Sequence, residues 1–158
     1  MSTQPDYRLT LPYPVSANRY WRSFVPRGHS RAIVTRSDEA KAYVDEVGWL
    51  ARQAGIRQPL KGRIELGLVL YPQLPQDWQR RARCNPQTWD DTVQCIDLGN
   101  CEKVLSDALN GIAWIDDKQL RRIVLERAEP DGVARVEVRI TRMAVPASPQ
   151  GDLLGAAA

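Results

Sequence analysis

The 158-residue sequence contains little of the chemistry on which several classes of protein depend. It has one histidine and three cysteines, Cys84, Cys95 and Cys101, with no Cys-x-x-Cys pair among them. Three cysteines cannot all pair within one chain, and zinc sites bring their ligands in close pairs, so neither a disulfide framework nor a zinc site is indicated. No Gly-x-x-x-x-Gly-Lys-Ser/Thr or Gly-x-Gly-x-x-Gly motif is present, and we therefore expect no nucleotide cofactor.

Long apolar runs are also missing from the chain. No stretch of about 18 apolar residues is available to span a bilayer, and the first residues lack the charged-then-apolar pattern of a signal peptide. We therefore expect a cytoplasmic protein without a membrane partner. Hydrophobic residues make up 43% of the chain and charged residues 26%, which is typical of one globular domain of this length.

Charge is distributed unevenly along the chain. The net charge of +3 is too small to require a polyanionic partner. Residues 1–36, however, hold six arginines against the single Asp6, whereas residues 97–117 hold five acids against the single Lys103. The sequence therefore combines a basic N-terminal region with an acidic cluster.

Hydrophobic periodicity predicts four strands and two helices. Alternating apolar residues indicate strands, and apolar residues at i, i+3, i+4 and i+7 indicate helices. Ser37 is placed to cap the first helix, and Asn110-Gly111 to end the second. The predicted strands cover residues 7–11, 64–70, 120–127 and 133–141, and the predicted helices cover residues 38–54 and 98–109. A turn of Pro130-Asp131-Gly132 predicts that the last two strands form a β-hairpin.

The remaining segments show no clear period. Residues 15–30 predict an exposed basic loop or an irregular hairpin, and residues 72–95 predict a long loop. The tail from Pro146 to Ala158 is expected to be disordered. We expect an α+β fold, a small mixed β-sheet with two main helices packed on it, forming a single domain over residues 1–142 with a tail over 143–158.

The segment from Cys95 to Gln119 carries the chemistry. Asp97 lies at the start of the second helix and Asp116 and Asp117 follow its end, so packing on a sheet can bring these acids together. Carboxylates 4 Å apart repel by about 4 kcal/mol at an effective dielectric near 20, and a hard cation such as Mg²⁺ would balance them. Lys103, one turn along the helix, could stabilise the charge that develops on a phosphoryl group. The alternative is structural: acids at a helix start serve as caps and an Asp-Asp-Lys run forms a solvated turn, and the pattern alone favours this interpretation.

The combination resembles the RusA family of Holliday-junction resolvases, small homodimeric Mg²⁺-dependent endonucleases common in phages and prophages. The stretch from Leu11 to Tyr20 resembles the opening of the family, and residues 97–119 resemble its core motif, Asp-x-Asp-Asn-x-x-Lys followed by Asp-Ala-Leu, an aromatic residue and Asp-Asp-x-Gln. The resemblance implies that Asp97 and Asp117 bind metal, that Lys103 is catalytic and that Mn²⁺ can replace Mg²⁺. Asn100 matches the asparagine of the motif, and Asp116, the acidic neighbour of Asp117, is a further candidate metal ligand.

One position departs from the pattern, because Gly99 stands where the family has its second aspartate. If the enzyme is active, another carboxylate must substitute or one metal position is weaker. Asp91 and Asp90, on a loop that can fold back, rank slightly ahead of Asp107, which helical geometry fixes. The alternative is a nuclease that binds junctions without cutting them.

The basic region suits a DNA partner. Arginine contacts to phosphate dominate affinity for DNA, although the same residues also make a soluble surface. The residues expected to contact DNA are Asn18, Arg19, Arg22, Arg27, Arg31, Arg36, Asn100 and Lys103. Tyr20, Trp21 and Phe24 could stack on unpaired bases at a branch point or anchor the loop to the core. The resemblance thus implies a crossover junction endodeoxyribonuclease for DNA recombination and repair, which acts as a homodimer on four-way junctions. A third possibility, beside the nuclease and the junction-binding protein, is an interaction domain in which the acids serve only as helix caps.

Overall fold

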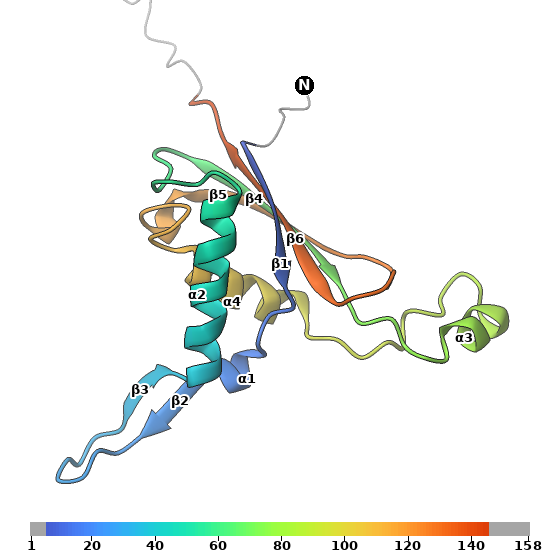
Figure 1. Ribbon diagram of the computed structural model, residues 1–158, viewed down its shortest axis with the longest axis horizontal. Helices are drawn as coiled ribbons and strands as arrows, with labels where there is room; N and C mark the ends of the chain where they lie inside the picture. Colours follow the sequence, from blue (N-terminus) through green and yellow to red (C-terminus); the bar gives the residue numbers. More distant parts are fainter. Residues whose placement is uncertain (1–5, 146–158) are drawn as a thin grey trace, which may run out of the picture.

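The computed structural model describes residues 6–145 and confirms an α+β fold (Figure 1). In chain order the elements are β1 (Tyr7–Pro12), α1 (Ala17–Tyr20), β2 (Trp21–Phe24), β3 (Ile33–Arg36), α2 (Asp38–Gln53), β4 (Ile64–Tyr71), α3 (Trp78–Cys84), α4 (Leu98–Leu109), the 3-10 turn η1 (Asp117–Gln119), β5 (Leu120–Arg127) and β6 (Arg135–Arg142). The disorder expected from Pro146 to Ala158 concerns residues outside this range.

A four-stranded mixed sheet forms the centre of the fold, with the strand order β1-β6-β4-β5. β6 pairs antiparallel with β1 on one side and with β4 on the other, while β4 and β5 run parallel. Helices α2 and α4 lie on one face of this sheet (Figure 1). The expected small mixed sheet with two main helices is therefore confirmed.

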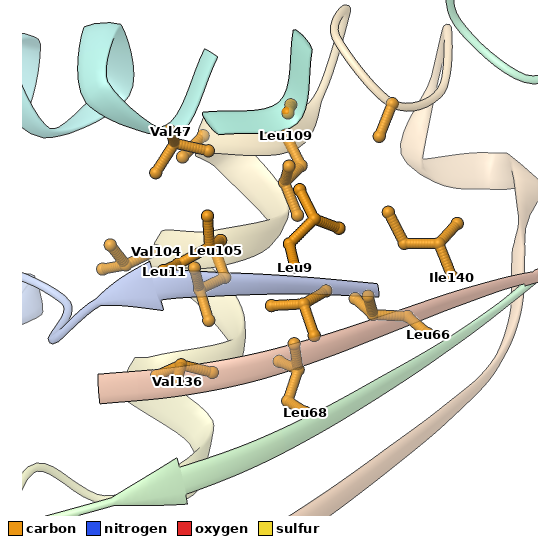
Figure 2. Close-up of a cluster of buried hydrophobic side chains, with 14 of the residues drawn as sticks. Leu9, Leu11, Val47, Leu66, Leu68, Val104, Leu105, Leu109, Val136 and Ile140 are labelled. Carbon is orange, nitrogen blue, oxygen red and sulfur yellow. The ribbon is translucent and has the colours of Figure 1, made fainter. Parts of the chain in front are cut away.

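The core lies between the two helices and the inward-facing strand residues. Successive side chains of a pleated strand point to opposite faces of the sheet. In β1, β4 and β6 every second side chain is apolar and points toward the helices. Figure 2 shows side chains from all of these elements in one cluster, with Val47 from α2 and Leu105 and Leu109 from α4 meeting Leu11 and Leu66 from the strands. Because α4 contributes to this core along its length, its opposite side is held in a fixed position. Cys101 and Trp114, assigned to the core from the sequence, are buried.

The expected β-hairpin between the last two strands is wrong, because β4 lies between β5 and β6. Helix α4 carries the chain back across the sheet, so β5 adds parallel to β4, as a crossover connection requires. The chain then passes over the end of β4, where the backbone N–H of Leu74 donates to the carbonyl of Gly132 over 3.1 Å. β6 therefore reaches the other edge of β4. Local turn chemistry predicted the turn but not the partner of each strand.

The segment between β4 and α4 is not a structureless loop, since it contains the short helix α3. None of the residues of α3 is buried, so this helix has no apolar face from which a period could be predicted. An ion pair between Arg81 and Asp77, 2.8 Å apart and one turn apart in sequence, stabilises it. Trp89 is buried against the body of the protein, where its indole nitrogen donates to Glu129 over 2.9 Å.

The basic segment after β1 forms α1 and the hairpin of β2 and β3, in line with the irregular hairpin expected there. Tyr20 is fully buried and anchors this region, whereas Trp21 and Phe24 are each 42% exposed. Ser37 caps α2 as predicted, with its hydroxyl accepting the backbone N–H of Ala40 over 3.1 Å. Within the described part of the chain, no helix is both long enough and apolar enough to cross a membrane.

Candidate active site

Helix α4 is the platform on which the candidate site is built. Its apolar face packs into the core, and this orientation leaves the stripe of Asn100, Lys103 and Asp107 on another side. Asp97 is the N-cap residue: its Oδ1 accepts the backbone N–H of Asn100 over 2.8 Å and its Oδ2 accepts the Asn100 side-chain amide over 2.6 Å. The structural role considered for this acid is therefore present. Asn100 also fixes the direction in which the Asp97 carboxylate points.

A surface pocket of about 250 Å³ lies where α4 meets the end of α1 and the turn η1. It is lined by Ala17, Tyr20, Trp21, Glu102, Lys103, Val104, Ser106, Asp107 and Asp117. The fold thus brings Lys103 and Asp117 together, although fourteen positions separate them in the sequence. Asp97 is not among the lining residues and lies at the N-terminal end of the same helix.

Asp117 reaches the pocket because the turn before β5 is tightly organised. Asp116 caps η1 by accepting the backbone N–H of Lys118 over 2.8 Å. Gln119 ties the turn to the segment before β4, since its amide donates to the carbonyls of Leu60 and Gly62 over 2.9 and 3.0 Å. Asp117 in turn accepts the indole N–H of buried Trp114 over 3.0 Å. Asp116 therefore shapes the turn, while Asp117 faces the pocket.

Asp107 already has partners of its own. Its Oδ2 accepts a hydrogen bond from the Tyr20 hydroxyl and lies 3.0 Å from Arg36 Nε and 2.9 Å from Arg36 Nη2. Burial, together with the Asp107 carboxylate, raises the pKa of Tyr20 above its ordinary value, so the phenol remains a proton donor. Because Arg36 balances its charge, Asp107 is not a free carboxylate for a cation.

Glu102 is a pocket residue that the sequence analysis did not single out. It lies one helical turn after Gly99, and its Oε1 accepts the Ser106 hydroxyl over 2.8 Å. Within residues 6–145 it forms no salt bridge. The signal that could have revealed it is the i, i+3, i+7 spacing of Gly99, Glu102 and Ser106, which places all three on one side of α4.

Asp90 and Asp91 are not brought to the pocket. The carbonyl of Asp90 accepts a hydrogen bond from Arg127 Nη2 over 2.8 Å, which holds this segment at the end of β5. Asp117 precedes the start of β5, and a strand of eight residues spans roughly 25 Å. The structure therefore places these two acids and Asp117 at opposite ends of the strand.

Gly99 lies in the first turn of α4, where the backbone does not require glycine. A Cβ atom built at this position would meet Asp97 Oδ1 at 3.3 Å and no other atom within 4 Å outside its immediate neighbours. The carboxylate of Asp97 is at the end of a side chain and can move by a few tenths of an ångström. The position can therefore accept a side chain.

Of the residues expected to contact DNA, Lys103 lines the pocket, and two of the arginines pair with acids at the start of α2. Arg19 pairs with Glu39 over 2.8 Å, and Arg22 lies 4.0 Å from Asp38. Arg27 and Arg31 are exposed near the tip of the β2–β3 hairpin, while Asn18 lies in α1.

Among residues 6–145, no group of three or more histidine, cysteine or acidic side chains gathers closely enough to enclose a metal ion.

A family model described as Endodeoxyribonuclease RusA matches residues 12–141, which include every element of the site. The chain belongs to the RusA family. A crossover junction endodeoxyribonuclease RusA from Escherichia coli strain K12 is 31% identical over 142 residues, covering 87% of this chain and 95% of the relative. A relative of the same name from Enterobacteria phage 82 is 30% identical over the same share of both chains. The RusA relatives are thus DNA-cleaving enzymes, of bacterial and of phage origin, named for their action at crossover junctions.

Proposed function

We propose that this protein is a Mg²⁺-dependent crossover junction endodeoxyribonuclease that resolves four-way DNA junctions by hydrolysing phosphodiester bonds. The observation that carries the proposal is the meeting of Lys103 and Asp117 in one pocket of a RusA-family chain. Their positions in the core motif match the catalytic lysine and the distal metal-binding aspartate that the family resemblance implies. A DNA substrate would place the enzyme in the cytoplasm of a bacterial cell, whether the gene is bacterial or carried by a phage.

The acids of the site suit a hard cation. Mg²⁺ prefers oxygen ligands, keeps several waters and is held in many enzymes by one or two carboxylates together with substrate phosphate, so it needs no enclosed cluster of acids. Asp97 and Asp117 are the residues that would hold it, and Mn²⁺ would take the same ligands. When bound, the cation would polarise a phosphoryl oxygen and lower the pKa of an attacking water.

Glu102 is the best replacement for the carboxylate that Gly99 lacks. It lies one turn along the same side of α4, faces the pocket that contains Asp117, and has a hydroxyl rather than a cation as its partner. Asp107 is neutralised by Arg36, and Asp90 and Asp91 are held at the far end of β5. The glutamate side chain, longer than that of aspartate, would span part of the one-turn distance along α4 between Glu102 and Gly99.

Lys103 supplies positive charge without acting as a metal ligand. It lies in the pocket beside Asp117, and within the described residues it forms no salt bridge. An ammonium group held there would stabilise the extra negative charge of a pentacovalent phosphorus in the transition state. Asn100 would keep the Asp97 carboxylate oriented through its two hydrogen bonds.

A homodimer would match the symmetry of the substrate. A four-way junction needs paired nicks on strands related by a twofold axis, and two copies of this chain would supply two such pockets. The arginines of the N-terminal region would bind phosphates beside each pocket, where contacts provide affinity without base specificity.

The deciding experiment is cleavage of a labelled synthetic four-way junction by the purified protein in Mg²⁺, in Mn²⁺ and in EDTA. We expect paired symmetric nicks that require a metal and are lost in Asp97→Asn. Asp45→Asn is the matched control, because Asp45 is an exposed acid on α2 away from the pocket. Cleavage that persists in EDTA or in Asp97→Asn would refute the proposed mechanism.

A second candidate function follows from Gly99 itself, which supplies no side chain at a metal-binding position of the motif. In that case the protein binds junctions without cutting them. Tight junction binding with no nicks in either metal would select this function.

A further inference from the structure

The hairpin of β2 and β3, with its connecting tip, forms an arm over residues 21–36 that projects from the body of the protein (Figure 1). The two strands pair from Trp21 with Arg36 to Phe24 with Ile33. Gly28, at φ 86°, provides the turn at the tip. An isolated two-stranded hairpin is only marginally stable in water, so an arm of this kind is expected to work against a surface.

The arm carries exposed apolar side chains. Phe24 and Ile33 are cross-strand partners on one face, and they are 42% and 47% exposed. Val34, on the other face, is 64% exposed. The guanidinium of Arg22 lies over the Phe24 ring, 5.9 Å from its centre, so cationic and aromatic groups share a face. The exposed pair of Phe24 and Ile33 makes this face of the arm a candidate interaction surface.

The charge of the arm identifies the kind of partner. Residues 21–36 contain four arginines and no acid. Arg36 is neutralised by Asp107, and Arg22 lies 4.0 Å from the exposed carboxylate of Asp38. Arg27 and Arg31, toward the tip, form no salt bridge within residues 6–145. Two arms packed against each other would bring like charges together, whereas a polyanion would be attracted. Aromatic and cationic groups in alternation are the combination that binds unstacked nucleic-acid bases with their phosphates.

The base of the arm is fixed to the catalytic pocket. Trp21 lines the pocket itself, and Arg36 is bonded to Asp107 on α4, one turn beyond Lys103. The backbone N–H of Ser37 also donates to the carbonyl of Tyr20 over 2.9 Å, which closes the hairpin at the body. DNA held by the arm is therefore held at a defined distance from Lys103 and Asp117.

We propose that this arm recognises the branch point of the DNA: Phe24 and Ile33 pack against bases that are unstacked there, and Arg22, Arg27 and Arg31 bind the flanking phosphates. The inference rests on the proposed function, since it assigns junction selectivity to a part of the same enzyme. In continuous duplex the base faces are covered by their neighbours, whereas at a branch they are accessible to an apolar side chain. The arm would thus distinguish DNA structure without reading DNA sequence.

The test is equilibrium binding in EDTA, where no cleavage occurs, to a four-way junction and to a duplex of the same sequence. Both DNAs carry 2-aminopurine, at the branch point and at the equivalent duplex position. For Phe24→Ala we expect the ratio of junction affinity to duplex affinity to fall about tenfold. We also expect the change in 2-aminopurine fluorescence that wild-type protein causes on binding the junction to be lost. Trp49→Ala is the matched control, because Trp49 is a 55% exposed aromatic residue on α2.

The arginines should behave differently from the aromatic residue. The double variant Arg27→Gln, Arg31→Gln should weaken binding to both DNAs by a similar factor and reduce the dependence of affinity on salt. Thermal melting of each variant shows whether the exposed substitutions leave the body folded.

Each outcome decides the proposal separately from the catalytic one. An unchanged affinity ratio in Phe24→Ala, or a wild-type protein with no preference for the junction, would overturn the role of the arm even if the enzyme cuts junctions. A Phe24→Ala variant that changes from dimer to monomer by sedimentation would assign the arm to a second copy instead, and would also overturn it. A lowered ratio in a protein that never cuts would support the arm and refute the nuclease.

Discussion

Arg36 Nη2, at the end of β3, lies 2.9 Å from Asp107 Oδ2 on α4. This contact joins the projecting arm to the helix that carries Lys103, across 71 positions of sequence. It also removes Asp107 from the set of free carboxylates, because a charge that is already balanced attracts a cation weakly. One ion pair therefore decides both how the arm is anchored and which acids remain for metal binding.

Breaking this ion pair should destabilise the protein by a modest amount. Both side chains are about one-third exposed, at 38% and 30%, so solvent screens the pair. We expect Arg36→Gln and Asp107→Asn each to lower the free energy of unfolding, with a coupling of about 1 kcal/mol in a double-mutant cycle. Urea unfolding of the wild type, the two single variants and the double variant measures this coupling. The same cycle made with Arg22 and Asp38, which are 4.0 Å apart and more exposed, should give a smaller coupling; equal couplings would contradict the role given to Asp107.

Gly99→Asp should strengthen metal binding and raise junction cleavage. The substitution restores the acid of the family motif in the first turn of α4, where a negative charge also favours the helix dipole. Its Cβ contact with Asp97 Oδ1, at 3.3 Å, requires only a small movement of that side chain. The readout is the rise in melting temperature on adding Mn²⁺, which increases as affinity increases.

Gly99→Ala is the control for Gly99→Asp, because it adds the same Cβ atom without a carboxylate. We expect no gain in the Mn²⁺ effect from alanine. An aspartate variant that folds normally and responds to Mn²⁺ no better than the alanine variant would show that this position does not face the metal.

Glu102→Gln should weaken metal binding while leaving the fold intact. The amide keeps the shape of the side chain and can still accept the Ser106 hydroxyl, so only the charge is lost. We expect the affinity for Mn²⁺ to fall about tenfold or more, measured by calorimetry. If Gly99→Asp restores the affinity in the Glu102→Gln background, the two positions serve the same cation. Unchanged affinity in Glu102→Gln would leave the substitute for Gly99 to be sought elsewhere.

Asp117→Asn should abolish cleavage without weakening junction binding. The variant removes a metal ligand and also a negative charge next to the DNA phosphate, so affinity should stay the same or increase. The asparagine can still accept the indole N–H of Trp114, which preserves the turn. Asp116→Asn is the neighbouring comparison, because Asp116 caps η1 and is expected to affect stability more than chemistry. Cleavage at the wild-type rate by Asp117→Asn would remove this residue from the site.

Acid should reveal the contact that ties β1 to β6. Asp6 Oδ1 lies 3.0 Å from Arg142 Nη2, and its hydrogen bonds to Arg142 hold the pKa of the Asp6 carboxyl below its ordinary value of 3.8. The contribution is complete above pH 3.8, where Asp6 is ionised in both the folded and the unfolded chain. It is lost as the pH falls through 3.8 and then through the lower folded-state pKa, because the unfolded chain takes up the proton first.

Asp6→Asn is the variant that checks this contribution. We expect wild type to exceed Asp6→Asn in unfolding free energy by about 1 kcal/mol or less near neutral pH, since the pair is partly exposed. The difference should shrink as the pH falls below 3.8, as followed by denaturant unfolding at several pH values. A difference that does not change with pH would mean that packing or the backbone contact, and not the carboxylate charge, stabilises this edge.

The sequence by itself determined the central strands, the two main helices and the core of the motif. Period-2 alternation marked β1 and β4, helical spacing and the Ser37 cap marked α2, and the Asp97 to Asp117 segment carried the resemblance to the RusA family. These signals are local, because each depends on side chains within one turn or one strand. The sequence missed α3, which has no buried residue and therefore no apolar period.

Only the tertiary structure decided which distant groups meet. The hairpin expected of β5 and β6 failed because strand partners are set by the crossover through α4, which places β4 between them. Asp107 ranked last among the substitutes for Gly99, yet it alone of the acids considered for that role lies in the pocket, and Arg36 has already neutralised it. Glu102 was overlooked because its spacing from Gly99 shows only that the two share a side of α4, and not which side faces the pocket. The role proposed for it depends on Glu102 and Asp117 lining one pocket, which the packing of α4 against the sheet and the turn before β5 brings about.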